Sequence, residues 1–184
     1  MSTLTTDRGL TESATEDMTA VRQPKLPCIT HALQHAIFNN AHFYSIATDK
    51  QGLIQLFNLG AERMLGYDAA DVVNKITPCD ICDPQELRAR ATALEQAFAT
   101  PLAAGFEALV YKASRGIDDV YELAFIRKDG GRFPAVVSVS ALRDSDDGII
   151  GYLLVGIDNT ARKQVEDRLR WTEESFRLMV ESVS

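Results

Sequence analysis

The sequence is poor in the features that define several classes of protein. It has three cysteines among 184 residues, and this small, odd number excludes the disulfide framework of a small secreted protein. Its longest apolar run, residues 149–157, is far shorter than the ~20 residues that span a bilayer. The N-terminus lacks the apolar core of a signal peptide. We therefore expect a cytoplasmic fragment, with any membrane anchor outside this sequence.

Catalytic signatures are missing as well. The sequence has no glycine-rich phosphate loop, no Ser-His-Asp set with its flanking signatures, and neither the phosphoacceptor motif nor the nucleotide-binding box of a histidine kinase. All three histidines, His31, His35 and His42, precede position 43. The net charge of −7 opposes broad nucleic-acid binding, which needs a basic surface. We expect a fragment that is not itself an enzyme and does not bind nucleic acid.

The strongest pattern is a set of three apolar runs between Tyr121 and Thr160. The runs are residues 121–126, 133–142 and 149–157, and polar, glycine-containing turns separate them. The middle run alternates in polarity, as a strand with two different faces does. The pattern predicts a three-stranded antiparallel meander.

Two more strands and a helix are predicted earlier in the chain. Residues 43–48 and 53–57 are short apolar runs joined by a turn in which Gly52 suits a bulge or a left-handed conformation. Asn58 is predicted to cap a helix that begins at Leu59, with Gly66 as its C-terminal stop.

The middle of the chain predicts helices. Asp68, with Asp71 three residues later, indicates a helical turn. Asp83 followed by Pro84 is a strong helix start, and apolar residues then recur at helical spacing until Thr100. Residues 106–111 are consistent with either an extra strand or a helical turn.

Two segments resemble the halves of a PAS domain. TDKQGLIQLFNLGAERMLGYDAADVV, residues 48–73, resembles the N-terminal half, and IRKDGGRFPAVVSVSALRDSDDGIIGYLLVGIDNTARKQ, residues 126–164, resembles the C-terminal half. The resemblance covers about residues 41–160. It implies an α+β fold, with a PAS-like five-stranded antiparallel sheet and helices on one face.

The regions flanking this domain differ from it in composition. Residues 1–27 are polar, without apolar periodicity, and we interpret them as a disordered leader. Residues 28–40 are predicted to form an N-terminal cap helix, which in PAS-like modules often packs against a partner subunit. Residues 161–184 form a charged helical segment that we expect to lead into a further domain, because EESFRLMVESVS resembles the start of another PAS unit.

The C-terminal segment has the spacing of a coiled-coil helix. Six residues repeat at alternating intervals of four and three and would form one seam: Val165, Leu169, Thr172, Phe176, Met179 and Val183. The seam predicts a parallel homodimer. The alternative is an amphipathic helix that packs on its own domain.

Asp158 and Thr160 resemble the Asp-x-Thr linker signature of PAS domains. An aspartate at this position can accept N–H groups of the first helical turn and pair with a cation, and Thr160 can cap the helix. The resemblance implies a sensor that relays a small-molecule or redox signal through its C-terminal helix to an effector such as a histidine kinase, in a two-component system. A ligand-free dimerisation module and a thiol redox sensor are the alternatives.

The resemblance also allows cofactors to be tested against residues. Haem-binding PAS domains typically bind the iron through a histidine on the long helix, and residues 84–99 contain none. The segment NKITPCDICDP differs from the flavin-binding motif of light sensors. FAD-binding relatives usually place a tryptophan near the flavin ring, whereas the only tryptophan here, Trp171, lies in the linker. Haem and flavin are therefore disfavoured, and the cofactor stays unknown. The domain is expected to bind either a small apolar ligand or no ligand at all. By facing and by analogy, the candidate residues that would line the pocket are Phe57, Met64, Leu94, Phe125 and Ser138.

Cysteine and histidine clusters offer two further candidate sites. Cys79 and Cys82 form a C-x-x-C pair, which could be a redox switch, half of a metal site, or two thiols that fill space beside the core. Cys28, His31 and His35 could chelate a metal if they share a helix face, but they have no supporting carboxylate. We predict no metal site.

Overall fold

The computed structural model describes residues 32, 36 and 39–182, so the predicted leader and most of the predicted cap helix lie outside the described residues. Five strands form one sheet in the order β2-β1-β5-β4-β3, and all neighbours are antiparallel. The strands are β1 (Tyr44–Asp49), β2 (Ile54–Phe57), β3 (Asp119–Ile126), β4 (Arg132–Arg143) and β5 (Ile149–Asp158). This is the predicted fold class, with the meander β3-β4-β5 as its larger half.

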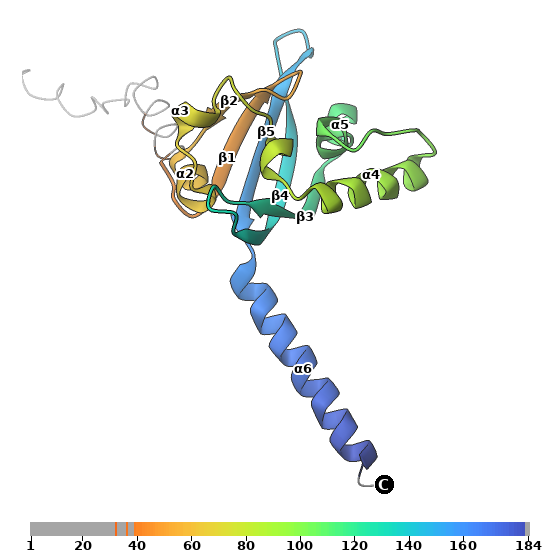
Figure 1. Cartoon of the computed structure of the whole chain (residues 1–184). Coiled ribbons are helices and arrows are strands. Elements are labelled where there is room, and N and C mark those ends of the chain that lie inside the picture. The colour runs from red at the N-terminus through yellow and green to blue at the C-terminus, as the bar shows by residue number, and fades with distance from the viewer. Residues whose placement is uncertain (1–31, 33–35, 37–38, 183–184) are drawn as a thin grey trace, which may run out of the picture.

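Helices pack against one face of the sheet, and one long helix leaves it (Figure 1). The helices are α2 (Leu59–Leu65), α3 (Ala69–Val72), α4 (Pro84–Phe98), α5 (Phe106–Val110) and α6 (Thr160–Ser182), with short 3₁₀ turns η1 (Pro78–Ile81) and η2 (Ala113–Arg115). Helices α2 to α5 lie beside the sheet, whereas α6 projects from the end of β5.

The predicted helix boundaries are confirmed by their capping contacts. The Asn58 side chain accepts the N–H of Ala61 at 2.8 Å, and Gly66 ends α2 with a φ of 77°, a value that glycine adopts without steric cost. The Asp83 carboxylate accepts two N–H groups at the start of α4. Caps of this kind stabilise a helix by about 1 kcal/mol each.

The undecided segment 106–111 is helical in its first five residues. Ala108, Leu109 and Val110 are all buried, and successive strand residues would instead alternate between the two faces of a sheet. A helical turn lying over the sheet can bury all three at once, and α5 does so.

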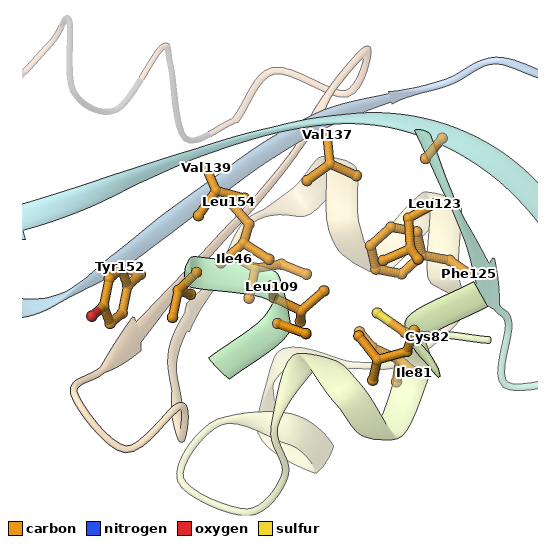
Figure 2. Close-up of a cluster of buried hydrophobic side chains, with 14 of the residues drawn as sticks. Ile46, Ile81, Cys82, Leu109, Leu123, Phe125, Val137, Val139, Tyr152 and Leu154 are labelled. Atoms are coloured by element: carbon orange, nitrogen blue, oxygen red, sulfur yellow. The ribbon is translucent and has the colours of Figure 1, made fainter. Parts of the chain in front are cut away.

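The core fills the space between the sheet and helices α2 to α5 (Figure 2). Along β4, Val137 and Val139 are buried, whereas Ser138 between them is exposed. Phe125 is fully buried, and its ring lies 5.2 Å from that of Tyr44 and 6.0 Å from that of Phe133, measured between centroids. Burial of each such side chain stabilises the fold by about 1.5–3 kcal/mol.

The opposite face of the sheet is partly apolar and uncovered within the described residues. Val120 on β3 is 65% exposed and Ile157 on β5 is 49% exposed, and Val136 of β4 lies on the same face. An apolar patch on a sheet is a common feature of protein interfaces.

Candidate functional site

The candidate site is the junction at which β5 becomes α6. Asp158 ends the strand, Asn159 lies between the two elements, and Thr160 begins the helix. The Asp158 Oδ1 atom accepts the Thr160 N–H at 2.8 Å and the Thr160 hydroxyl at 2.5 Å. The Thr160 hydroxyl therefore donates to Asp158, whereas the predicted cap would accept a helical N–H. The Asn159 carbonyl accepts the N–H of Lys163 at 3.0 Å, which is the first hydrogen bond of the helix between residues four apart.

Arg127 connects this junction to the rest of the domain. Its Nη2 atom donates to Asp158 Oδ2 at 2.9 Å, and its Nη1 atom donates to the carbonyl of Met64 in α2. The guanidinium carbon lies 4.0 Å from the ring centroid of Phe133 on β4. One side chain thus links α2, β4 and the start of α6, so a movement of any of them changes the geometry at Asp158.

Glu122 on β3 makes a second contact with the first turn of α6. Its carboxylate pairs with Lys163 at 2.6 Å and accepts the Asn159 side-chain amide at 3.2 Å. The hydrogen bond with Glu122 raises the pKa of Lys163. The N–H of Asn159 donates to the Pro134 carbonyl at 2.8 Å. The helix is therefore held on two sides, by Arg127 through Asp158 and by Glu122 through Lys163.

Beyond its first turn, α6 exposes its apolar side chains. Val165 is 66% exposed, Leu169 62% and Trp171 71%. The helix therefore does not pack along its own domain, which was the alternative interpretation of the seam. Thr172 lies on the described part of the helix, whereas the side chains of Phe176 and Met179 and the whole of Val183 lie outside it.

The sequence prediction located the two polar residues of this junction but not their partners. Asp158 and Thr160 lie where the Asp-x-Thr resemblance implied. Arg127 and Glu122 are 31 and 37 residues from their contacts Asp158 and Asn159, and only the register of β3, β4 and β5 brings them there. The charged Arg127 before the Asp-Gly-Gly turn was the one available signal.

Four of the five predicted pocket residues belong to one core or pack against it, and the fifth, Ser138, does not. Phe57, Leu94 and Phe125 are buried in the core, and Met64 packs against it at its edge. Ser138 is exposed on the other face of the sheet, so it cannot line a pocket beneath the helices. The alternation along β4, which places Ser138 opposite Val137, is the physical reason.

The C-x-x-C pair lies beside the core as two free thiols. Cys82 is 1% exposed and forms a backbone bridge with Phe125, next to which Figure 2 shows it. Burial raises the pKa of Cys79 to about 11 and raises that of Cys82 well above its usual value. A helix N-terminus can lower the pKa of a nearby thiol, but burial has the larger effect at both cysteines. Since the thiolate is the reactive form, this geometry favours the space-filling interpretation.

Residues 32, 36 and 39–182, which the structure describes, lack both a metal-ligand cluster and a membrane-spanning helix. Among those residues, no three His, Cys, Asp or Glu side chains gather as a metal site would require. The candidate set of Cys28, His31 and His35 lies outside the described residues. None of the described helices combines the length and apolarity needed to cross a membrane.

Comparisons with known proteins match this architecture. The PAS domain family matches residues 41–161. No curated protein matches the chain. Among solved structures, the PAS domain of a protein from Colwellia psychrerythraea aligns with a TM-score of 0.54 and 17% identity, over 72% of this chain and 98% of that one.

Two other solved structures show the same fold at low identity. A sensory box histidine kinase/response regulator from Burkholderia thailandensis has a TM-score of 0.54 and 19% identity, over 79% of this chain and 97% of that one. An RNA-binding light-oxygen-voltage receptor has a TM-score of 0.58 and 18% identity, over 88% of this chain but 41% of its own.

Proposed function

The chain belongs to the PAS domain family, and on this basis we propose that it is a sensor and dimerisation module that signals through α6 to an effector domain. The observation that carries the proposal is the junction itself. A helix of 23 residues is separated by one residue from the end of β5. Glu122 of β3 pairs with Lys163 in its first turn, and Arg127 of the β3-β4 connection pairs with Asp158, two residues before the helix begins. A rearrangement in the domain therefore changes the exit direction of α6.

The energies of the contacts that Asp158 makes with Arg127 and with Thr160 suit a switch. Asp158 and Arg127 are each 29% exposed, and ion pairs of this kind contribute about 0.2–1 kcal/mol. The Asp158 contacts with Thr160 add about 1 kcal/mol, the usual effect of a helix cap. A difference of ~1.4 kcal/mol changes a population ratio tenfold, so breaking these contacts would shift the exit geometry without unfolding the domain.

The exposed seam of α6 supports a parallel homodimer. A single helix that leaves its Val165 and Leu169 side chains in water gains stability when a second copy covers them. The uncovered apolar face of the sheet, with Val120 and Ile157, offers a second surface for the same dimer. A parallel arrangement would let two domains rotate one coiled coil, a common way to transmit a conformational change.

We propose a histidine kinase as the effector because one of the solved structures with this fold belongs to a sensory box histidine kinase. The test is a chimera in which residues 1–182 replace the sensor of a histidine kinase, with the heptad phase of α6 continued into the kinase. We expect autophosphorylation to change in Asp158→Asn and to keep its wild-type level in Asp146→Asn, which removes an exposed carboxylate in the β4-β5 turn, away from the junction. Equal autophosphorylation in all three chimeras would reject the proposal.

A further inference from the structure

A cleft beside the junction gathers positive charge. It has a volume of about 560 Å³ and lies between the end of α2 and the β3-β4 turn. Its lining includes Arg63 from α2 and Arg127, Lys128 and Asp129 from the turn. Three cations and one carboxylate leave a formal charge of +2 in a chain whose net charge is −7. A cleft of this size suits a small molecule.

The positively charged side chains of the cleft have N–H groups available to bind an anion. No ion pair joins Arg63 to any residue that the structure describes. Arg127 uses Nη1 for Met64 and Nη2 for Asp158, and of its five N–H groups the other three have no partner among the described residues. Lys128 pairs with Asp71 at 2.9 Å, but both side chains are half exposed, so this pair exchanges readily with a competing anion.

Some of the charged residues of the cleft stabilise its walls through hydrogen bonds, but Arg63 does not do so within the part of the chain that the structure describes. At the end of α2, Arg127 and the N–H of Lys128 satisfy the carbonyls of Met64 and Leu65. The Asp129 carboxylate accepts the Gly131 N–H at 2.8 Å and shapes the turn. Arg63 performs no such task, although it lines the same cleft as Arg127.

We propose that this cleft binds a small molecule carrying a phosphate or carboxylate group, and that the bound anion competes with Asp158 for Arg127. The coupling rests on the proposed relay function of the junction. Two anions that bind one guanidinium repel each other, so each is held less tightly than it would be alone. Binding would therefore loosen the contact between Arg127 and the start of α6. By reciprocity, loss of the Asp158 charge strengthens binding.

The test is a titration of isotope-labelled protein with inorganic phosphate, and separately with citrate, followed by NMR at constant ionic strength set with sodium chloride. We expect saturable shifts at the amides of Gly66 and Lys128. Arg63→Gln should weaken binding at least fivefold, and Asp158→Asn should strengthen it at least fivefold, the lower end of common coupling effects. Lys50→Gln, which removes one exposed cation from the β1-β2 turn, should leave the affinity unchanged. Whichever probe binds more tightly identifies the class of anion.

Three results would overturn the inference. Shifts that do not saturate, or that are equal in Arg63→Gln and wild type, would exclude the site. Saturable binding that Asp158→Asn does not strengthen would exclude competition for Arg127. The relay is judged separately, by hydrogen exchange of the Thr160 and Lys163 amides in Asp158→Asn without added anion. Faster exchange there, with no phosphate or citrate binding, would reject the cleft as a site and leave the relay intact.

Discussion

Removal of the Asp158 carboxylate should loosen the start of α6 while the domain stays folded. Asp158→Ala deletes the ion pair with Arg127 and both contacts with Thr160. The ion pair is partly exposed and contributes about 0.2–1 kcal/mol, and the contacts with the first helical turn contribute about 1 kcal/mol. The total of about 1–2 kcal/mol is a small share of a domain stability of about 5–15 kcal/mol.

The assay is amide hydrogen exchange with a thermal melt of the same sample. A local loss of about 1–2 kcal/mol corresponds to a ~5- to 30-fold increase in exchange, expected at the Thr160 and Lys163 amides and absent from the core strands. Asp158→Asn, which keeps an acceptor for the Thr160 N–H, should give the smaller part of this range. Asp71→Ala serves as the control, because it removes a carboxylate from an exposed ion pair outside the junction.

The reasoning would be refuted if exchange at Thr160 and Lys163 were the same in Asp158→Ala and Asp71→Ala. It would also be refuted if Asp158→Ala unfolded the whole domain, since the residue would then stabilise the fold and not the exit of one helix. A double-mutant cycle with Arg127→Gln isolates the energy of the pair.

The remaining predictions concern association, thiols, capping and colour. Leu169→Asp should weaken the homodimer, because a charge in the seam must lose its water; sedimentation equilibrium showing only monomer for the wild type would contradict this. In a Cys28→Ser background, about 1 in 1000 molecules should carry Cys79 as a thiolate at pH 8, because its pKa is about 11. Cys79 should therefore react slowly with a disulfide reagent, and Cys82 should react only when the protein unfolds. Rapid reaction of either thiol would support the redox alternative. Hydrogen bonds from the backbone N–H groups of Glu86 and Gln85 lower the pKa of Asp83 in the folded protein. The stability that ionised Asp83 contributes is therefore complete above the pKa of about 3.9 that it has in the unfolded chain, and it is lost as the pH falls through the lower pKa of the folded state. Thermal melts of Asp83→Asn at acid pH should lack this part of the pH dependence. Purified protein should lack the visible absorption of flavin or haem, and a stoichiometric band from either would show that a cofactor binds without the residues considered above.

Local signals made the fold predictable from the sequence. Asn58, Gly66 and Asp83 act on backbone groups within a few residues, so their effects on helix boundaries do not depend on the rest of the fold. The alternation in β4 likewise depends only on strand geometry. The sequence does not decide the form of residues 106–110, because a short apolar run has no period of its own and its packing over the sheet determines whether it is a helix or a strand.

The site was predictable only in part, because its contacts join distant segments. The partner of Asp158 is set by the register of three strands, and a shift of one residue would direct Arg127 elsewhere. The analogy places Ser138 in a pocket, whereas the alternation along β4 places it on the exposed face of the sheet. The high pKa of Cys79 comes from burial, which its short C-x-x-C motif does not reveal.

The most direct test of the relay is the distance between the two α6 helices of a dimer. A spin label placed at position 168 of each protomer, in a background without the native cysteines, would report this distance by pulsed EPR. We predict one short distance for the wild type, consistent with parallel helices whose axes lie about 8–10 Å apart, and a shifted or broadened distribution in Asp158→Asn. Helices too far apart to pair, or identical distributions in the two proteins, would contradict the proposal that this junction controls α6.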